Sequence, residues 1–196
     1  DYQITLAAGA LTITDLSGNS DSTSLIENTG EAGSVRFFAP GRTISVNGGL
    51  NINSLTAPFV LSSLTSITIN EGAGANTTSI LSQIAASTMN FPSLTINGGA
   101  SNDVVSLNND IVFNPGASLD LNLQNDGGGG GEDTVFFSNS CDVSLSGAGA
   151  ATIKCSKNIL FNTGSTLTTV DGDLVLEANQ QAVRTPGSFY GVYLQD

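Results

Sequence analysis

Residues 66–76 read SITINEGAGAN, and residues 93–103 read SLTINGGASND. The two stretches lie 27 positions apart, and every apolar residue of the first meets an apolar residue of the second. Upstream, residues 43–49 (TISVNGG) show the same apolar alternation followed by Asn-Gly. Self-similarity at a fixed offset is the signature of a repeat architecture, so these stretches decide the fold prediction.

A second repeat lies in the C-terminal half of the chain. Residues 111–119 (IVFNPGASL) match residues 159–167 (ILFNTGSTL) at an offset of 48, and residues 135–143 fall 24 positions from each. We therefore predict a period of 24 residues with one looser repeat of 27. Within residues 119–123 (LDLNL) apolar and polar residues alternate, which is the period of two expected for a strand with one buried face.

The repeats predict an all-β fold, a parallel β-helix (β-solenoid) with about 24 residues per coil and roughly eight coils. Residues 1–196 are predicted to form one solenoid segment, in which residues 1–40 repeat least well and form a divergent β cap or two divergent coils. Residues 80–89 also fit a short helix. A β-sandwich has many short strands too, but it does not place the same turn residues at a fixed offset. Structural amide ladders are predicted for Asn70 with Asn97 and for Asn114 with Asn162.

The composition excludes several classes of function. The chain has 5 Lys plus Arg against 17 Asp plus Glu, a net charge of −12, and no His. Catalysis through a Ser-His-Asp or Cys-His arrangement is therefore excluded, as is a His-ligated zinc. The cations are also too few and too scattered for a nucleic-acid-binding face. Charged residues are scarce because stacked coils place like charges over one another, where they repel.

One turn predicts a calcium site. Residues 97–105 (NGGASNDVV) resemble the calcium-binding nonapeptide of RTX proteins, although Ser101 stands where that pattern has Gly. The partner turn one coil earlier matches less well. The alternative interpretation is a tight turn that needs Gly for its backbone geometry. The candidate ligands are Asn97, Asp103, Glu71 and Asn76.

Two further patterns suggest alternative functions. Asp171 and Asp173 are spaced as two carboxylates on one face of an extended segment, the minimum requirement of a glycosidase. The chain lacks the histidine and basic residues of β-helix pectinases, so we expect no enzymatic activity. Thr68 lies over Thr95 in the repeat, which raises ice binding as an alternative, but the equivalent positions elsewhere drift to Ser, Asn and Asp.

The remaining candidates are the two cysteines and a glycine-rich run. Cys141 and Cys155 lie in successive predicted strands of one coil, and either a disulfide or two buried free thiols fits their positions. Residues 125–133 contain five consecutive glycines between acidic residues. We expect this run to be a loop extruded from one coil, because ordering five glycines costs too much entropy for a preorganised site.

The strings LTITD (residues 11–15), GRTISVNGG (41–49), SLTINGG (93–99) and DLVLEA (173–178) resemble segments of large repetitive bacterial surface proteins of the adhesin type. Those proteins combine filamentous-haemagglutinin-like coils with degenerate RTX-type turns. The resemblance implies an exported, cell-surface or extracellular protein with a filamentous and adhesive role, and in some relatives calcium. It transfers no catalytic residue.

The expected role is therefore that of a non-catalytic structural or adhesive solenoid. The chain starts at Asp1 and its only methionine is Met89, so we expect a processed or excised segment of a larger protein. No apolar stretch approaches the roughly 18 residues needed to cross a bilayer. The expected partners are further copies of the segment or adjacent repeats, stacked end to end, and surface glycans or a neighbouring cell. The alternatives are a calcium-dependent binding module and a carbohydrate-active enzyme.

Overall fold

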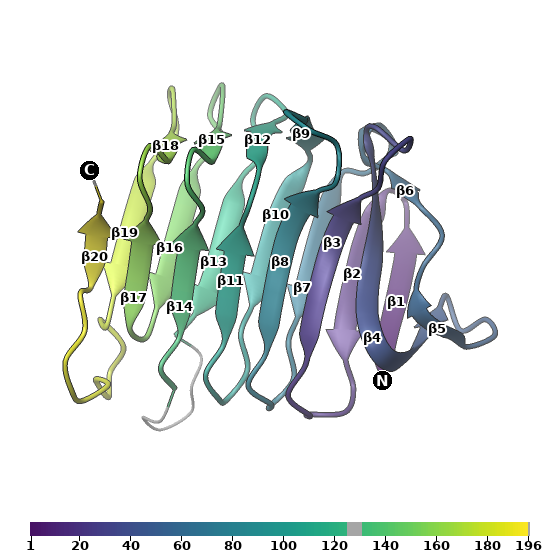
Figure 1. Cartoon of the computed structure of the whole chain (residues 1–196), viewed down its shortest axis with the longest axis horizontal. Helices are drawn as coiled ribbons and strands as arrows, with labels where there is room; N and C mark the ends of the chain where they lie inside the picture. The colour runs from purple at the N-terminus through teal and green to yellow at the C-terminus, as the bar shows by residue number, and fades with distance from the viewer. Residues whose placement is uncertain (125–130, 196) are drawn as a thin grey trace.

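The computed structural model describes residues 1–124 and 131–195, and these residues form β-strands joined by turns (Figure 1). The all-β prediction is confirmed. The one helical element in the described part of the chain is a single 3₁₀ turn, η1 (Leu61–Ser63). Residues 80–89 do not form the short helix that their apolar pattern allowed, because they comprise the end of β8 (Thr77–Ser82), a turn and the start of β9 (Thr88–Phe91).

One wall of the molecule is a stack of parallel strands, here called the first stack. Neighbouring strands are in register, so that Ile67 lies beside Leu94, Leu94 beside Leu119, and Leu119 beside Ala151. The pairing of residues 66–70 with residues 93–97 is the one that the sequence repeat predicts. The stack consists of β2 (Ala10–Asp15), β7 (Ser66–Asn70), β10 (Ser93–Asn97), β13 (Leu119–Leu123), β16 (Ala151–Cys155) and β19 (Leu174–Ala178).

A second and a third stack form the other two walls. Each strand of the second stack follows a strand of the first after a turn, and the third stack belongs to a separate four-stranded sheet. The second stack consists of β3 (Ser22–Glu27), β8 (Thr77–Ser82), β11 (Val104–Leu107), β14 (Thr134–Phe137), β17 (Asn158–Phe161) and β20 (Val192–Leu194). The third consists of β9 (Thr88–Phe91), β12 (Asp110–Phe113), β15 (Asp142–Ser144) and β18 (Thr166–Thr168).

The spacing of the strands along the chain departs from the constant period expected. In the first stack, Leu94, Leu119, Ala151 and Leu174 lie side by side, although the interval from Leu119 to Ala151 is longer than the intervals before and after it. The segments between strands differ in length, whereas the strands themselves stay in register. Over the described residues the first stack has six strands, not the roughly eight coils expected.

The N-terminal residues build a different arrangement. Strands β1 (Tyr2–Ala7) and β4 (Ser34–Val46) lie between β2 and β3 in the sheet order and so join the first stack to the second. β1 pairs antiparallel with β2, and β4 pairs antiparallel with β3, with β5 (Ile52–Leu55) and with β6 (Phe59–Val60). In Figure 1 these strands lie at the right-hand end of the molecule. They account for the weak repetition of residues 1–40.

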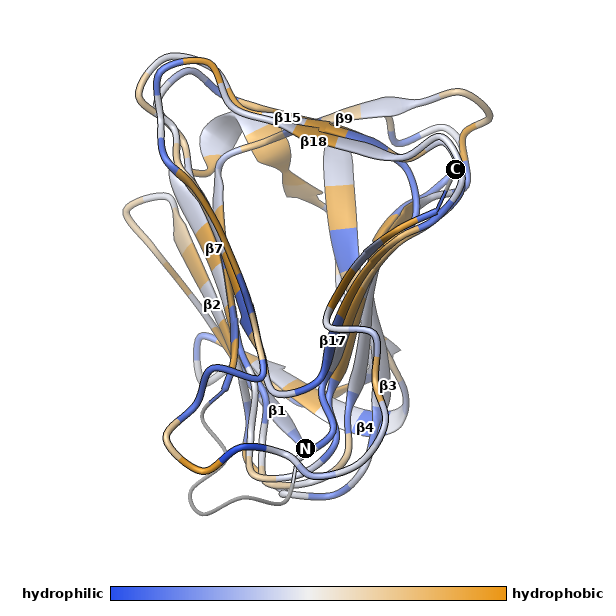
Figure 2. Ribbon diagram, turned by 90° about the vertical axis from the view of Figure 1, so that its left-hand side faces the viewer, coloured by the Kyte–Doolittle hydropathy of each residue, from blue (hydrophilic) through white to orange (hydrophobic). Residues whose placement is uncertain are grey.

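The core fills the space between the three walls. Figure 2 looks along the stacks from the C-terminal end, and the walls surround one interior. Inward-facing side chains of the middle strands are fully buried, and aromatic rings from neighbouring levels contact one another: the Phe137 and Phe161 ring centroids are 4.2 Å apart in a stacked pair, and those of Phe91 and Phe113 are 6.2 Å apart. The stacks are therefore held by a continuous apolar column.

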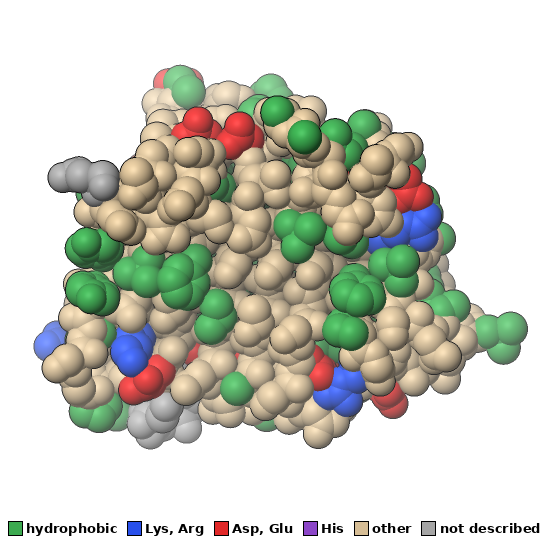
Figure 3. Space-filling model, viewed as in Figure 1, with side chains coloured by type: hydrophobic (Ala, Val, Ile, Leu, Met, Phe, Trp, Pro, Cys, Tyr) green, Lys and Arg blue, Asp and Glu red, His purple; other side chains and the backbone are tan. Residues whose placement is uncertain are grey.

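The outer surface is polar but carries few charges. Figure 3 shows that Lys, Arg, Asp and Glu side chains lie mainly toward the margins of the face formed by the second stack. Four ion pairs occur among the described residues, and the closest involves Arg42 and Asp21. No helix in the ranges 1–124 and 131–195 has both the length and the apolar composition that crossing a membrane requires.

Candidate binding face

The outward face of the first stack carries polar side chains in straight rows. Because inward and outward positions alternate along each strand, the in-register pairing that aligns the core also aligns the outward residues. The rows repeat at the strand spacing of about 4.8 Å. The middle row is Thr12, Thr68, Thr95, Asp120 and Thr152, and the row beside it is Asn70, Asn97, Asn122, Lys154 and Glu177.

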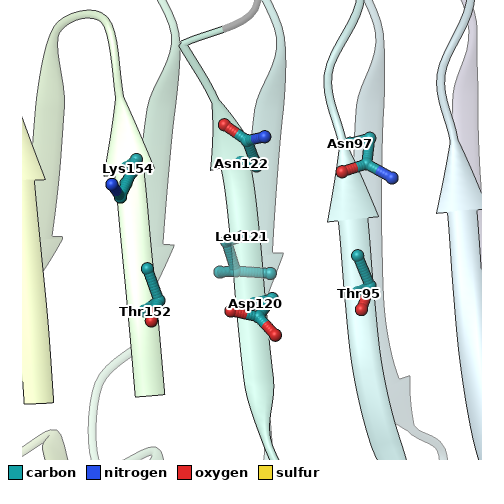
Figure 4. Close-up of a pocket in the computed structure, with 7 residues that line it drawn as sticks. All are labelled: Thr95, Asn97, Asp120, Leu121, Asn122, Thr152 and Lys154. Atoms are coloured by element: carbon teal, nitrogen blue, oxygen red, sulfur yellow. The ribbon is translucent and has the colours of Figure 1, made fainter. Parts of the chain in front are cut away.

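A shallow pocket of about 370 Å³ lies in this face (Figure 4). Three neighbouring strands build it: β10, β13 and β16. Asp120 and Asn122 lie at its centre, while Leu121 belongs to the inward side of the same strand and is fully buried. The lining residues are Thr95, Asn97, Asp120, Leu121, Asn122, Thr152 and Lys154.

Hydrogen bonds and one ion pair define what the pocket offers to a ligand. The Asn97 side-chain amide donates to the Asn70 carbonyl oxygen Oδ1 at 2.9 Å, and Lys154 Nζ lies 3.3 Å from Glu177 Oε2. The positive charge of Lys154 is thus balanced by its neighbour. Within the described residues the Asp120 side chain makes no hydrogen bond or ion pair, so its carboxylate is available as an acceptor. Threonine hydroxyls both donate and accept, and the pocket therefore suits a ligand rich in hydroxyl groups.

The first predicted asparagine ladder is present, and the second is not. Asn70 and Asn97 lie side by side at the ends of β7 and β10 and share the hydrogen bond described above. Asn114 follows β12 in the third stack, whereas Asn162 follows β17 in the second stack. The similar strands at residues 111–113 and 159–161 therefore belong to different walls, and the asparagines that follow them do not stack.

A different ladder lies inside the corner where the first stack turns into the second. The Asp103 carboxylate accepts the backbone N–H of Asn76 at 2.9 Å and that of Gly99 at 2.6 Å. The backbone N–H of Asp103 in turn donates to Asp133 Oδ1 at 2.7 Å, and that of Asp133 donates to the Ser156 hydroxyl at 2.8 Å. Each of these side chains thus accepts the backbone N–H group of the equivalent corner residue one strand earlier in the second stack, or, for Ser156, of Asp133. We call Asn76, Asp103, Asp133 and Ser156 the corner ladder; all four are buried.

The corner ladder includes two of the four predicted calcium ligands, Asn76 and Asp103. Both Asp103 oxygens accept backbone N–H groups, and Asn97 lies on the outward face, away from Asn76 and Asp103. The described residues contain no group of three or more His, Cys, Asp and Glu side chains placed to hold a metal ion. The glycine turn has a steric cause: a Cβ on Gly99 would lie 1.7 Å from the Gly72 carbonyl oxygen. The structure shows Asp103 in a capping role, and the calcium prediction itself stays a prediction.

Glu71, the fourth predicted calcium ligand, points into the same corner. Its Oε1 accepts the Thr78 hydroxyl, and its buried Oε2 has no hydrogen-bond partner in the part of the chain that the structure describes. Burial, with a smaller contribution from the nearby carboxylates of Asp103, Asp133 and Asp15, raises the pKa of Glu71 to about 8. Glu71 is therefore largely protonated at neutral pH.

Both cysteines are buried free thiols in the structure. Cys155 is the last residue of β16 and donates to the Asn158 carbonyl oxygen at 3.1 Å, while Cys141 precedes β15 in the third stack and donates to the Asn109 carbonyl oxygen at 3.2 Å. Burial raises the pKa of each thiol to about 12. Of the two alternatives open from the sequence, the structure has the pair of thiols and not the disulfide.

The paired carboxylates Asp171 and Asp173 do not line the pocket. Asp171 and Asp173 are exposed in the turn that precedes β19. Most of the glycine-rich run, residues 125–130, lies outside the described residues. The sequence analysis missed the pocket residues Asp120 and Lys154 as a site. The alignment of Asp120 with Thr95, and of Lys154 with Asn122 and Asn97, would have indicated the site. The unequal spacing of the strands along the chain hides that alignment in the sequence.

Comparisons with known proteins return no relative: no family model, no curated protein and no solved structure matches the chain. The function is therefore argued from the residues of the binding face and from the stacks that position them.

Proposed function

We propose that this chain is a short parallel β-solenoid that serves as a non-catalytic, extracellular structural and adhesive element. In this proposal each set of strands from the first, second and third stacks is one coil, and the outward face of the first stack contacts the ligand. The extracellular placement rests on the resemblance of the strand-and-turn strings to repetitive surface proteins. The surface partner is a neutral polysaccharide.

The observation that carries the proposal is the alignment of polar rows over a fully buried core. A rigid row of hydroxyl, amide and carboxylate groups, spaced at about 4.8 Å, presents a regular array to an extended polymer. Ile67, Leu94 and Leu119 beneath that array are completely buried, so the face is held by packing and not by its own polar contacts. Such preorganisation lowers the entropy lost on binding.

The charge of the chain supports a neutral ligand over an acidic one. The net charge is −12, and the one cation of the pocket, Lys154, is balanced by Glu177. An anionic polymer would meet repulsion from Asp120 at the centre of the pocket. A neutral polysaccharide meets acceptors and donors that its hydroxyl groups satisfy.

Co-sedimentation with insoluble cellulose and chitin, and with polygalacturonate gel as the acidic probe, tests the proposal. We expect the protein to bind a neutral polymer. Its affinity for that polymer should fall at least tenfold in the double variant Asp120→Ala/Asn122→Ala. The matched control is Ser79→Ala/Ser106→Ala, which removes two neighbouring outward side chains of the second stack and should leave binding unchanged. Equal losses in both variants, or binding to neither neutral polymer, would refute the adhesive role.

A further inference from the structure

Two carboxylates enter the corner of the molecule from neighbouring strands of the first stack. Asp15 is the last residue of β2, and Glu71 directly follows the last residue of β7. Two residues earlier, Ile13 and Ile69 lie side by side with their side chains in the core. Because inward positions recur at every second residue, Asp15 and Glu71 continue these inward rows, and their strands are about 4.8 Å apart.

Each of these two carboxylates has one buried oxygen without a partner. Asp15 is 8% exposed, and its Oδ1 accepts the backbone N–H and the hydroxyl of Ser17 at 2.8 and 2.7 Å. Its Oδ2 accepts no hydrogen bond within residues 1–124 and 131–195, and the same holds for Oε2 of Glu71. A buried carboxylate oxygen without a donor is costly, so buried charges in proteins are paired or coordinate metal ions.

The unpartnered oxygen of Asp15 points at the turn that contains Glu71. A Cβ placed on Gly72, the residue after Glu71, would lie 2.4 Å from Asp15 Oδ2 and 3.1 Å from the Gly18 Cα. Gly72 therefore keeps open a space between two turns that any side chain would fill. Ala73, one residue further along, is exposed, so this space lies close to the surface and a small ion can reach it.

No basic side chain neutralises this pair in the part of the chain that the structure describes. None of the four ion pairs there includes Asp15 or Glu71. Arg42 interacts electrostatically with Asp15, but its guanidinium forms an ion pair with Asp21. The nearby carboxylate of Asp103 adds further negative charge. The corner thus combines a negative potential with two acceptor oxygens that lack donors.

We infer that Asp15 and Glu71 bind a hard divalent cation, Ca²⁺ or Mg²⁺, through Asp15 Oδ2 and Glu71 Oε2. Both ions take oxygen ligands, and water and backbone carbonyl oxygens commonly complete the shell that carboxylates begin. Without the cation, the proton that Glu71 holds reduces the charge of the pair, and the cation displaces it. Asp15 is not among the calcium ligands predicted from the sequence, and Asn76 and Asp103 keep their capping roles. The inference does not depend on polysaccharide binding.

Isothermal titration calorimetry of the full chain with CaCl₂ and, separately, with MgCl₂ tests the inference, after treatment with EDTA and dialysis. We expect one site per chain for at least one of the two ions. The melting temperature should rise with the concentration of that ion, because a ligand of the folded state stabilises it. Heat with one ion alone identifies which of the two the site selects.

Two conservative variants and a matched control locate the ion. Asp15→Asn and Glu71→Gln should each lower the affinity at least tenfold, because each removes a charged ligand and keeps the shape of the side chain. Circular dichroism shows whether each variant is folded. The control Asp171→Asn/Asp173→Asn removes two exposed carboxylates elsewhere and should leave the affinity unchanged.

Three results would overturn the inference. Neither heat nor a shift in melting temperature with either ion at millimolar concentration shows that the corner binds no divalent cation. An affinity that is kept in folded Asp15→Asn places the ion at other residues, such as the turn predicted from the sequence. An affinity that falls equally in the control shows attraction to the overall negative charge and not to a site.

Discussion

Replacing Glu71 by Gln should stabilise the protein at alkaline pH and leave it nearly unchanged at acidic pH. Burial raises the pKa of Glu71 from 4.5 to about 8. Between these values the unfolded chain has lost the proton that the folded protein still holds, so the stability due to this group is complete below pH 4.5 and is lost as the pH rises through 8. Gln keeps the neutral form at every pH.

The magnitude follows from the size of the shift. Each pKa unit corresponds to about 1.4 kcal/mol, so the full shift sets a ceiling of about 5 kcal/mol on the alkaline gain. Water entering the corner at high pH reduces this, and we expect a gain of about 2–4 kcal/mol at pH 9 relative to pH 5. The difference between the two pH values is the relevant quantity, because any packing cost of the Gln amide is the same at both.

Urea unfolding of both proteins at pH 5, 7 and 9, followed by circular dichroism, measures this difference. The control variant is Glu177→Gln, which removes a partly exposed carboxylate paired with Lys154. It should change the free energy of unfolding by less than about 1 kcal/mol. A Glu71→Gln gain that is equal at pH 5 and pH 9 would refute the reasoning, since it would show that Glu71 ionises in the folded protein as it does in the unfolded chain.

Three other outcomes are expected. Gly99→Ala should destabilise the protein by about 3 kcal/mol or more in urea unfolding, because the added Cβ meets a backbone oxygen that cannot move away; Gly48→Ala, where only the positive φ of 69° opposes the change, should cost about 1 kcal/mol. Phe137→Ala should cost about 3–5 kcal/mol in the same assay, because the ring is fully buried and stacked on Phe161; an unchanged midpoint would contradict the core described above. Neither Cys141 nor Cys155 should react with a thiol reagent at pH 8 until the protein is unfolded, because both are buried with pKa values near 12.

The sequence predicts the strands and two of their alignments well, because these depend on local patterns. Residues 66–70 pair with residues 93–97 at the predicted offset of 27, and residues 135–137 pair with residues 159–161 at the predicted offset of 24. The constant period fails because the turns vary, and a comparison of strings cannot tell which wall a strand belongs to. Residues 111–113 and 159–161 look alike because both are buried strands before a Gly turn with positive φ at Gly116 and Gly164.

The pairing of β1 with β4 and the corner ladder are harder to predict, because both depend on contacts between residues far apart in the chain. β1 and β4 are recognisable as strands, but their pairing across the end of the core joins residues far apart in the chain, such as Tyr2 and Ile44. The Asp103 carboxylate looks like a metal ligand in sequence because capping a backbone N–H and binding a cation both favour Asp after a glycine turn. Only the positions of Asn76 and Asp133 show that the capping role applies.

The crossing of β1 and β4 also affects the order in which the strands unfold. Strands near the N-terminus have pairing partners on both sides and a covered core, whereas β20 pairs with β17 alone and leaves Leu194 exposed. In a stack of nearest-neighbour levels, stability is set largely by the contacts between adjacent levels. When residues 1–196 are studied by themselves, loss of structure under a protease should therefore begin at β20 and proceed from strand to strand toward the N-terminus.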